Sequence, residues 1–93
     1  MGYSWTGWSL SGLRGIEPFE VLQVLYAERR WPQRAHGPSG TTVLTIWART
    51  RGGRPLIVAV RRVGEREWLI LGARDMYASE RVDFVRWEEA QDG

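Results

Sequence analysis

The alternation of apolar and polar residues is clearest between residues 43 and 74, where it predicts three β-strands. The first covers residues 43–50 and alternates strictly. The second, residues 56–63, opens with a continuous apolar run, which is typical of a central strand covered on both faces. The third covers residues 68–74. Because the connections are too short for a parallel crossover, we expect an antiparallel meander.

The predicted faces and turns of this meander can be assigned from single residues. Alternation places Leu44, Ile46 and Ala48 on one face of the first strand. Gly52 and Gly53 supply the positive φ angles that a tight hairpin needs. Residues 31–42 have a loop-like composition that is compatible with a short edge strand at residues 34–36, so the meander has three to four strands.

Helices are predicted on both sides of the meander. Residues 17–28 begin with Pro18, which suits a first helical position, and carry an apolar stripe. The stripe consists of Phe19, Val21, Leu22, Leu25 and Tyr26. Residues 77–90 predict a closing helix with one inward side. That side consists of Val82, Val85, Phe84 and Trp87. Residues 3–15 predict a short, frayed helix, because their glycines and serines are poor helix formers.

The sequence therefore predicts an α+β fold with N-terminal helices, a three- to four-stranded antiparallel meander and a C-terminal helix. A chain of 93 residues without an internal repeat is one domain, residues 1–93. The absence of cysteine excludes a disulfide-stapled secreted protein and a thiolate metal site. No run approaches the roughly 18 apolar residues of a membrane span, and we expect a cytoplasmic protein.

Charge is segregated along the chain. Residues 29–74 carry ten Arg against two Glu, whereas residues 1–28 and 75–93 are both net acidic. Every Lys+Arg residue is Arg, and the planar guanidinium suits bidentate contact with phosphate. Codon bias in a GC-rich genome would explain the choice of Arg over Lys, but it would not explain the clustering. The basic middle segment predicts an anionic partner.

Three stretches of the sequence resemble the BrnT toxin family of the RelE/ParE-like group. They are GIEPFEVLQVLY from residue 15, VLTIWARTRGGRPLIVAV from residue 43 and WLILGARDM from residue 68. The last strand ends on Gly72, Ala73, Arg74 and Asp75, where the family has a small residue, Ala, Arg and another polar residue. The resemblance implies a compact RelE-like fold and a bacterial type II toxin that cleaves RNA and inhibits translation. It also implies an antitoxin partner that is a small DNA-binding protein.

Two other functions stay open. The family usually has a Lys-His or Arg-His pair before the helix-opening Gly, whereas this chain has Leu13 and Arg14 before Gly15. This difference favours a toxin-like domain without catalysis, which binds nucleic acid or a protein partner. If the matched stretches are only general hairpin sequence, the chain is an unrelated interaction domain. A homodimer and a toxin–antitoxin hetero-oligomer are both open.

RNA cleavage by internal transfer needs a base, positive charge for the transition state and a proton donor. Arg74 is our candidate for phosphate stabilisation, with Arg61 or Arg62, whichever points to the same face. The alternative for Arg74 is a salt bridge to the C-terminal helix. Glu67 and Asp75 are candidate carboxylates, and Asp75 equally suits a cap of the final helix.

Further residues are candidates for RNA binding, because aromatic rings stack on bases while guanidinium groups hold phosphates. They are Arg49, Arg51, Arg54, Trp47, Arg34 and His36. For Trp47 the alternative is an anchor of the core. His36 is the single histidine and lies in a Pro/Gly-rich loop. The sequence has no glycine-rich phosphate loop and no metal-ligand spacing, so we expect neither a cofactor nor a metal.

Overall fold

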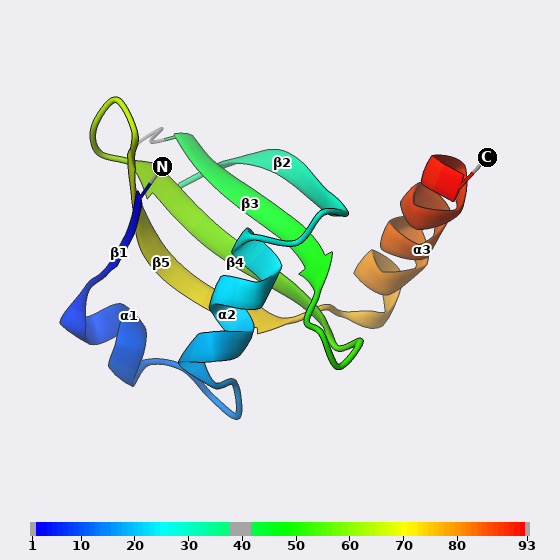
Figure 1. Cartoon of the computed structure of the whole chain (residues 1–93), viewed down its shortest axis with the longest axis horizontal. Helices are drawn as coiled ribbons and strands as arrows, with labels where there is room; N and C mark the ends of the chain where they lie inside the picture. Colours follow the sequence, from blue (N-terminus) through cyan, green and yellow to red (C-terminus); the bar gives the residue numbers. More distant parts are fainter. Residues whose placement is uncertain (1, 38–41, 93) are drawn as a thin grey trace.

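The computed structural model describes residues 2–37 and 42–92, which form an α+β fold (Figure 1). The elements in chain order are β1 (Gly2–Trp5), α1 (Gly7–Ser11), α2 (Pro18–Leu25), β2 (Arg30–His36), β3 (Thr42–Arg49), β4 (Pro55–Arg62), β5 (Glu67–Asp75) and α3 (Ala78–Asp92). The predicted order of N-terminal helices, meander and C-terminal helix is confirmed.

The five strands form one sheet in the order β1-β5-β4-β3-β2. Strands β2 to β5 are the predicted antiparallel meander. The edge strand β2 is longer than predicted and covers Arg30–His36. Of the stretch predicted to be loop-like, residues 38–41 lie outside the described residues. The β3–β4 hairpin turns at Gly53, whose φ of 91° only glycine adopts readily.

The fifth strand, β1, was not predicted. Residues 3–15 were expected to form one frayed helix, but the helix covers only Gly7–Ser11 and Gly2–Trp5 pair in parallel with β5. Tyr3 and Trp5 alternate with exposed neighbours and pack on the core, which is a strand pattern. A capping box then starts α1, because the side chains of Thr6 and Ser9 each accept a hydrogen bond from the other's backbone N–H.

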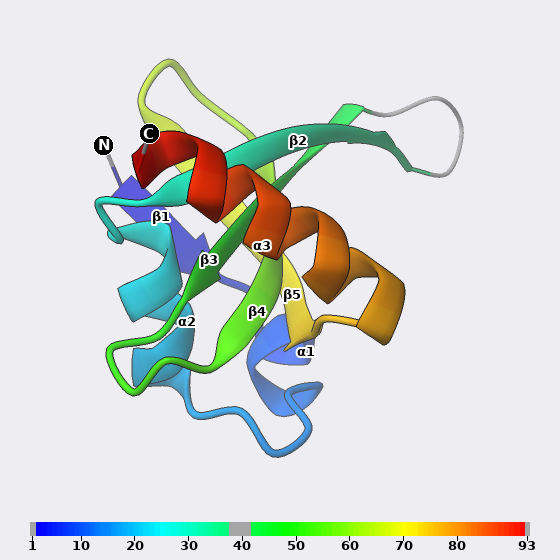
Figure 2. The ribbon, with the colours of Figure 1, turned by 90° about the vertical axis from the view of Figure 1, so that its right-hand side faces the viewer.

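The helices pack on opposite faces of the sheet (Figures 1 and 2). On one face α2 covers the larger core, in which Val21, Val24 and Leu25 meet alternate residues of β3, β4 and β5. On the other face α3 packs through Phe84, which is fully buried against Ile57 and Met76. Three tryptophans close this smaller core: Trp31, Trp47 and Trp87. We call these the α2 face and the α3 face.

Both helices depart from their predicted boundaries or apolar sides. Helix α2 ends at Leu25 rather than near Glu28, and the guanidinium of Arg30 donates to the carbonyl oxygens of Leu25 and Ala27, each at 3.3 Å, which satisfies acceptors at and after the helix end. Of its predicted stripe, only Val21 and Leu25 are buried, whereas Phe19, Leu22 and Tyr26 are exposed.

In α3, Val82 was predicted to face inward but is 51% exposed, whereas Phe84 is buried as predicted. The helix touches the sheet along one narrow line, through Phe84 and Trp87. That line leaves no inward position for Val82. None of the described helices has both the length and the apolar character needed to cross a membrane.

Candidate nucleic-acid interface

The sheet separates the predicted site residues into two groups at its opposite ends. The β3–β4 end carries Arg49, Arg51, Arg54, Arg74 and Asp75. The β4–β5 end carries Arg34, His36, Arg61, Arg62 and Glu67. Arg74 pairs with Ile57 in the sheet, and Arg61 lies on the same face four residues along β4, about 13 Å away at the usual rise of a strand. Arg74 and Arg61 therefore do not share one site.

At the β3–β4 end, Arg74 joins the sheet to α3. Its guanidinium donates two hydrogen bonds to the carboxylate of Glu80, at 2.7 and 2.8 Å, and lies 4.3 Å from the ring centre of Tyr77. The same carboxylate accepts the backbone N–H of Tyr77 at 2.8 Å. The hydrogen bond from Arg74 lowers the pKa of Glu80, so the pair stays charged. This is the salt bridge to the C-terminal helix that the sequence offered as an alternative.

Arg54 is held by three groups. Its guanidinium donates to both carboxylate oxygens of Asp75 at 2.8 Å, to the carbonyl oxygen of Gly15 at 2.8 Å and to Glu20 at 3.3 Å. The hydrogen bond from Arg54 lowers the pKa of Asp75. Asp75 was a candidate cap for the final helix, but the backbone N–H of Tyr77 donates to Glu80 instead. Arg54 therefore ties the segment before α2 to the end of β5.

Arg49 and Trp47 belong to the core beneath α3. Arg49 donates to both carboxylate oxygens of Glu88, at 2.8 and 2.9 Å, and lies 5.5 Å from the ring centre of Phe84. Trp47 packs edge-on against Trp31, as the core-anchor alternative for it proposed. Arg51 is the exception at this end, since its side chain makes no contact that would neutralise it within the described part of the chain.

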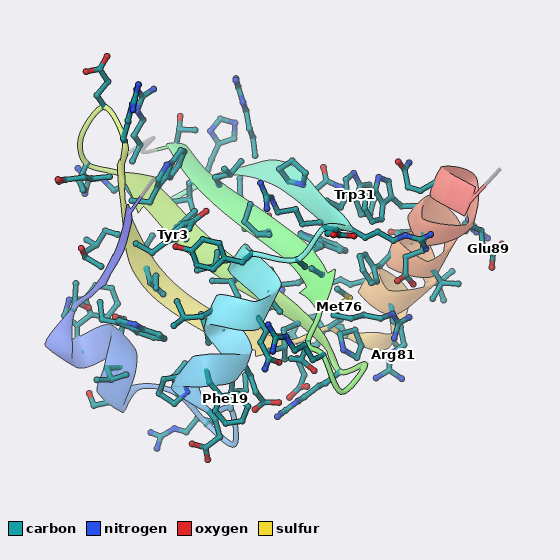
Figure 3. All side chains as sticks on the ribbon, in the orientation of Figure 1. Tyr3, Phe19, Trp31, Met76, Arg81 and Glu89 are labelled. Atoms are coloured by element: carbon teal, nitrogen blue, oxygen red, sulfur yellow. The ribbon has the colours of Figure 1, made fainter. Side chains whose placement is uncertain are left out.

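At the β4–β5 end, one row of side chains crosses the whole sheet on the α2 face. Cross-strand pairing places His36 opposite Thr42, Arg62 opposite Trp68 and Tyr3 beside Trp68. Continuing the register from Leu44 and Val60 places Thr42 beside Arg62. The row is therefore His36, Thr42, Arg62, Trp68 and Tyr3. In Figure 3, Tyr3 lies over this face beside α2, while Trp31 lies toward α3.

A pocket of about 500 Å³ opens in this row, beyond the reach of α2. We call it the basic pocket, and its lining residues are Arg34, Thr42, Leu44, Arg61, Arg62 and Trp68. Arg34 lies opposite Leu44 in the next row, on the same face as Arg62. A second pocket of about 420 Å³ adjoins it and shares Arg62 and Trp68. Both volumes fall in the range of small-ligand sites.

The arginines of the basic pocket have no carboxylate partners among residues 2–37 and 42–92. The Arg62 guanidinium donates to the carbonyl oxygens of Gly64 at 3.0 Å and Glu65 at 2.9 Å, so it is oriented while its charge is unbalanced. Arg34 and Arg61 make no side-chain hydrogen bond in that part of the chain. The basic pocket therefore carries unbalanced positive charge within the described chain, in contrast to Arg49, Arg54 and Arg74 at the β3–β4 end, which are paired with carboxylates.

The remaining candidates at this end lie away from the row. Glu67 is next to Trp68 and so points to the opposite face of the sheet. Its side chain lies beside Gly64, where an added Cβ would be 3.4 Å from that of Glu67. In the part of the chain that the structure describes, no cluster of His, Asp or Glu could hold a metal ion.

Sequence reasoning missed Trp68 as a site residue. It was assigned only to the third strand of the meander, although the alternation with Ile70 already fixed its face. The register with Arg62 was the signal that could have found it, but register depends on the length and type of the intervening turn.

A comparison with protein-family models gave no match, and no curated protein matches the sequence.

Proposed function

We propose that this protein is a metal-independent ribonuclease of the toxin type, which acts on RNA through the basic pocket. One observation carries the proposal: Arg34 and Arg62, which have no carboxylate partners among the described residues, share a face and an end of the sheet with the single histidine, His36. Phosphate is the anion that closely spaced guanidinium groups bind best, because their planar forks match its oxygens.

Residues at the β4–β5 end could meet two of the three needs of internal transfer, the base and the positive charge. His36 is the candidate general base for the 2′-hydroxyl, since imidazole is the side chain suited to proton transfer near neutral pH. Arg34 and Arg62 would stabilise the extra negative charge of the five-coordinate phosphorus. The two arginines are two strand spacings and two residues along the strands apart, about 12 Å between backbones, which their long side chains can span.

The resemblance to BrnT toxins extends the proposal to a partner and a cellular location. A toxin-type ribonuclease that inhibits translation acts in the cytoplasm and is held inactive by a cognate antitoxin, which we propose to be a small DNA-binding protein. Neutralising the arginines of the basic pocket with an acidic antitoxin segment would block access of RNA by direct competition.

The test uses purified protein and a 5′-labelled single-stranded RNA in the presence of EDTA. We expect fragments that end in a 2′,3′-cyclic phosphate, and we expect His36→Gln to lower the rate by about a hundredfold or more, as for loss of a general base. Arg86→Gln is the matched control, because it removes an exposed arginine on α3 that has no ion pair within the described chain. Intact RNA with wild-type protein, or full activity of His36→Gln, would contradict the catalytic assignment.

A second candidate function is RNA binding without cleavage. The observation that favours it is the distance between the two proton-transfer groups of the row. His36 on β2 and Tyr3 on β1 are four strand spacings apart, about 19 Å, so they cannot serve one phosphodiester as base and acid. Tight binding of RNA that stays intact would support this function.

A further inference from the structure

Trp68 has the surroundings of a base-stacking platform. Trp68 is partly buried and packs against the core of the α2 face. It also lines both pockets of the β4–β5 end, so part of it is open to a ligand. An aromatic ring that is anchored in a core and partly exposed can stack on a nucleobase of any sequence.

The two pockets share Trp68 and Arg62. The basic pocket adds Arg34 and Arg61, and the adjoining pocket adds Glu65 and Arg66. Arg62 therefore lies at the junction, with its guanidinium oriented by two carbonyl oxygens. Arginines gathered around a stacking ring can hold the phosphates next to a stacked base of a single strand.

We propose that the two pockets bind consecutive nucleotides of an unpaired strand, with a base stacked on Trp68 and the phosphates held by Arg34 and Arg62. This inference rests on the proposed function, and it specifies the substrate as a segment that is single-stranded where it is bound. Glu65 offers a carboxylate acceptor for the amino group of a base in the adjoining pocket.

A duplex does not fit this site. Bases stacked inside an A-form helix present no free face to Trp68, and the deep, narrow major groove of RNA admits no side chain from a sheet. Duplex RNA could contact the arginines only through its backbone phosphates. The stacking contact is therefore the part of the site that distinguishes an unpaired strand from a paired one.

The test measures fluorescence anisotropy with a labelled RNA of about eight nucleotides, the same RNA annealed to its complement, and the corresponding single-stranded DNA. His36→Gln serves as the background if the wild type cleaves the probe. We expect the single strand to bind at least about tenfold more tightly than the duplex, given the usual contribution of one stacked base. A DNA strand that binds as tightly as RNA would show that the site reads unpaired bases of either nucleic acid.

Variants of Trp68 and of the arginines separate stacking from charge. Trp68→Leu should weaken single-strand binding about tenfold and leave duplex binding unchanged, while Trp68→Phe should keep most of the affinity. Arg34→Gln should lower the slope of log K against log salt by about 0.7, the value for one phosphate on a single strand. The matched controls are Trp8→Leu, an exposed tryptophan on α1, and Arg86→Gln, an exposed arginine on α3.

The possible results distinguish a failure of the two-nucleotide site from a failure of the proposed ribonuclease. Equal affinity for single strand and duplex, or normal single-strand binding by both a folded Trp68→Leu and Arg34→Gln, would overturn the two-nucleotide site even if the protein cleaves RNA elsewhere. Selective, Trp68-dependent binding without cleavage would uphold the site and reject the ribonuclease. Absence of binding to every nucleic acid tested would overturn the site and leave the β4–β5 end as a surface for an acidic protein.

Discussion

The substitution Arg74→Gln distinguishes a structural from a catalytic role for this arginine. Arg74 is 45% exposed and its partner Glu80 is 20% exposed, so solvent screens the pair and its contribution lies near the upper end of a surface ion pair. Adding the contact with the Tyr77 ring, we expect the substitution to reduce the free energy of unfolding by about 1 to 1.5 kcal/mol. For a chain of this size, that loss lowers Tm by roughly 4–10 °C.

The assay pairs thermal unfolding with RNA anisotropy on the same preparation. Arg74→Gln should melt earlier and bind RNA within about twofold of the wild type, because it contributes no phosphate contact. Arg34→Gln should weaken RNA binding but change the free energy of unfolding by no more than about 0.5 kcal/mol, since its side chain has no ion-pair partner in the described chain. The reasoning is refuted if Arg74→Gln melts with the wild type and loses RNA binding.

Three further predictions concern the framework. Phe84→Ala removes a fully buried ring from beneath α3 and should lower the free energy of unfolding by about 3–5 kcal/mol in a denaturant titration. Gly53→Ala forces a side chain into a turn with φ of 91° and should cost about 1 kcal/mol in the same measurement, whereas Gly2→Ala, with open space around its Cβ, should be neutral. Hydrogen bonds from arginines lower the pKa values of Asp75 and Glu80 below their ordinary 3.8 and 4.5. As the pH drops through that range, these two carboxylates are protonated in the unfolded chain before they are protonated in the folded chain, so the free energy of unfolding should fall. Glu80→Gln should reduce this pH dependence, and a free energy of unfolding that does not change with pH would contradict the role of the two pairs.

Much of the fold follows from local pattern. The alternation of residues 43–50, the continuous apolar run after residue 55 and the glycine turn at Gly53 specify a meander whatever the rest of the chain does. Strand β1 could not be predicted from local pattern, because its four residues acquire strand geometry only by pairing with β5, some 65 residues away.

The site was harder to predict than the fold because a charged residue is defined by its partners. In the sequence Arg49, Arg54 and Arg74 are equivalent to Arg34 and Arg62 as phosphate ligands. Only the three-dimensional arrangement shows that the first three are bound by carboxylates from α2, β5 and α3, whereas the last two have none in the described chain. Local pattern carries no information on such long-range pairing.

Amide NMR during titration with a short single-stranded RNA tests the location of the RNA site most directly, because it reports every residue at once, and His36→Gln can be used to prevent cleavage. The account predicts that the indole signal of Trp68 and the amides around Arg34 and Arg62 shift first, while those of Arg74, Tyr77 and Glu80 stay in place. Shifts centred on Arg74 and the start of α3, with Trp68 unchanged, would contradict it and return the site to the β3–β4 end.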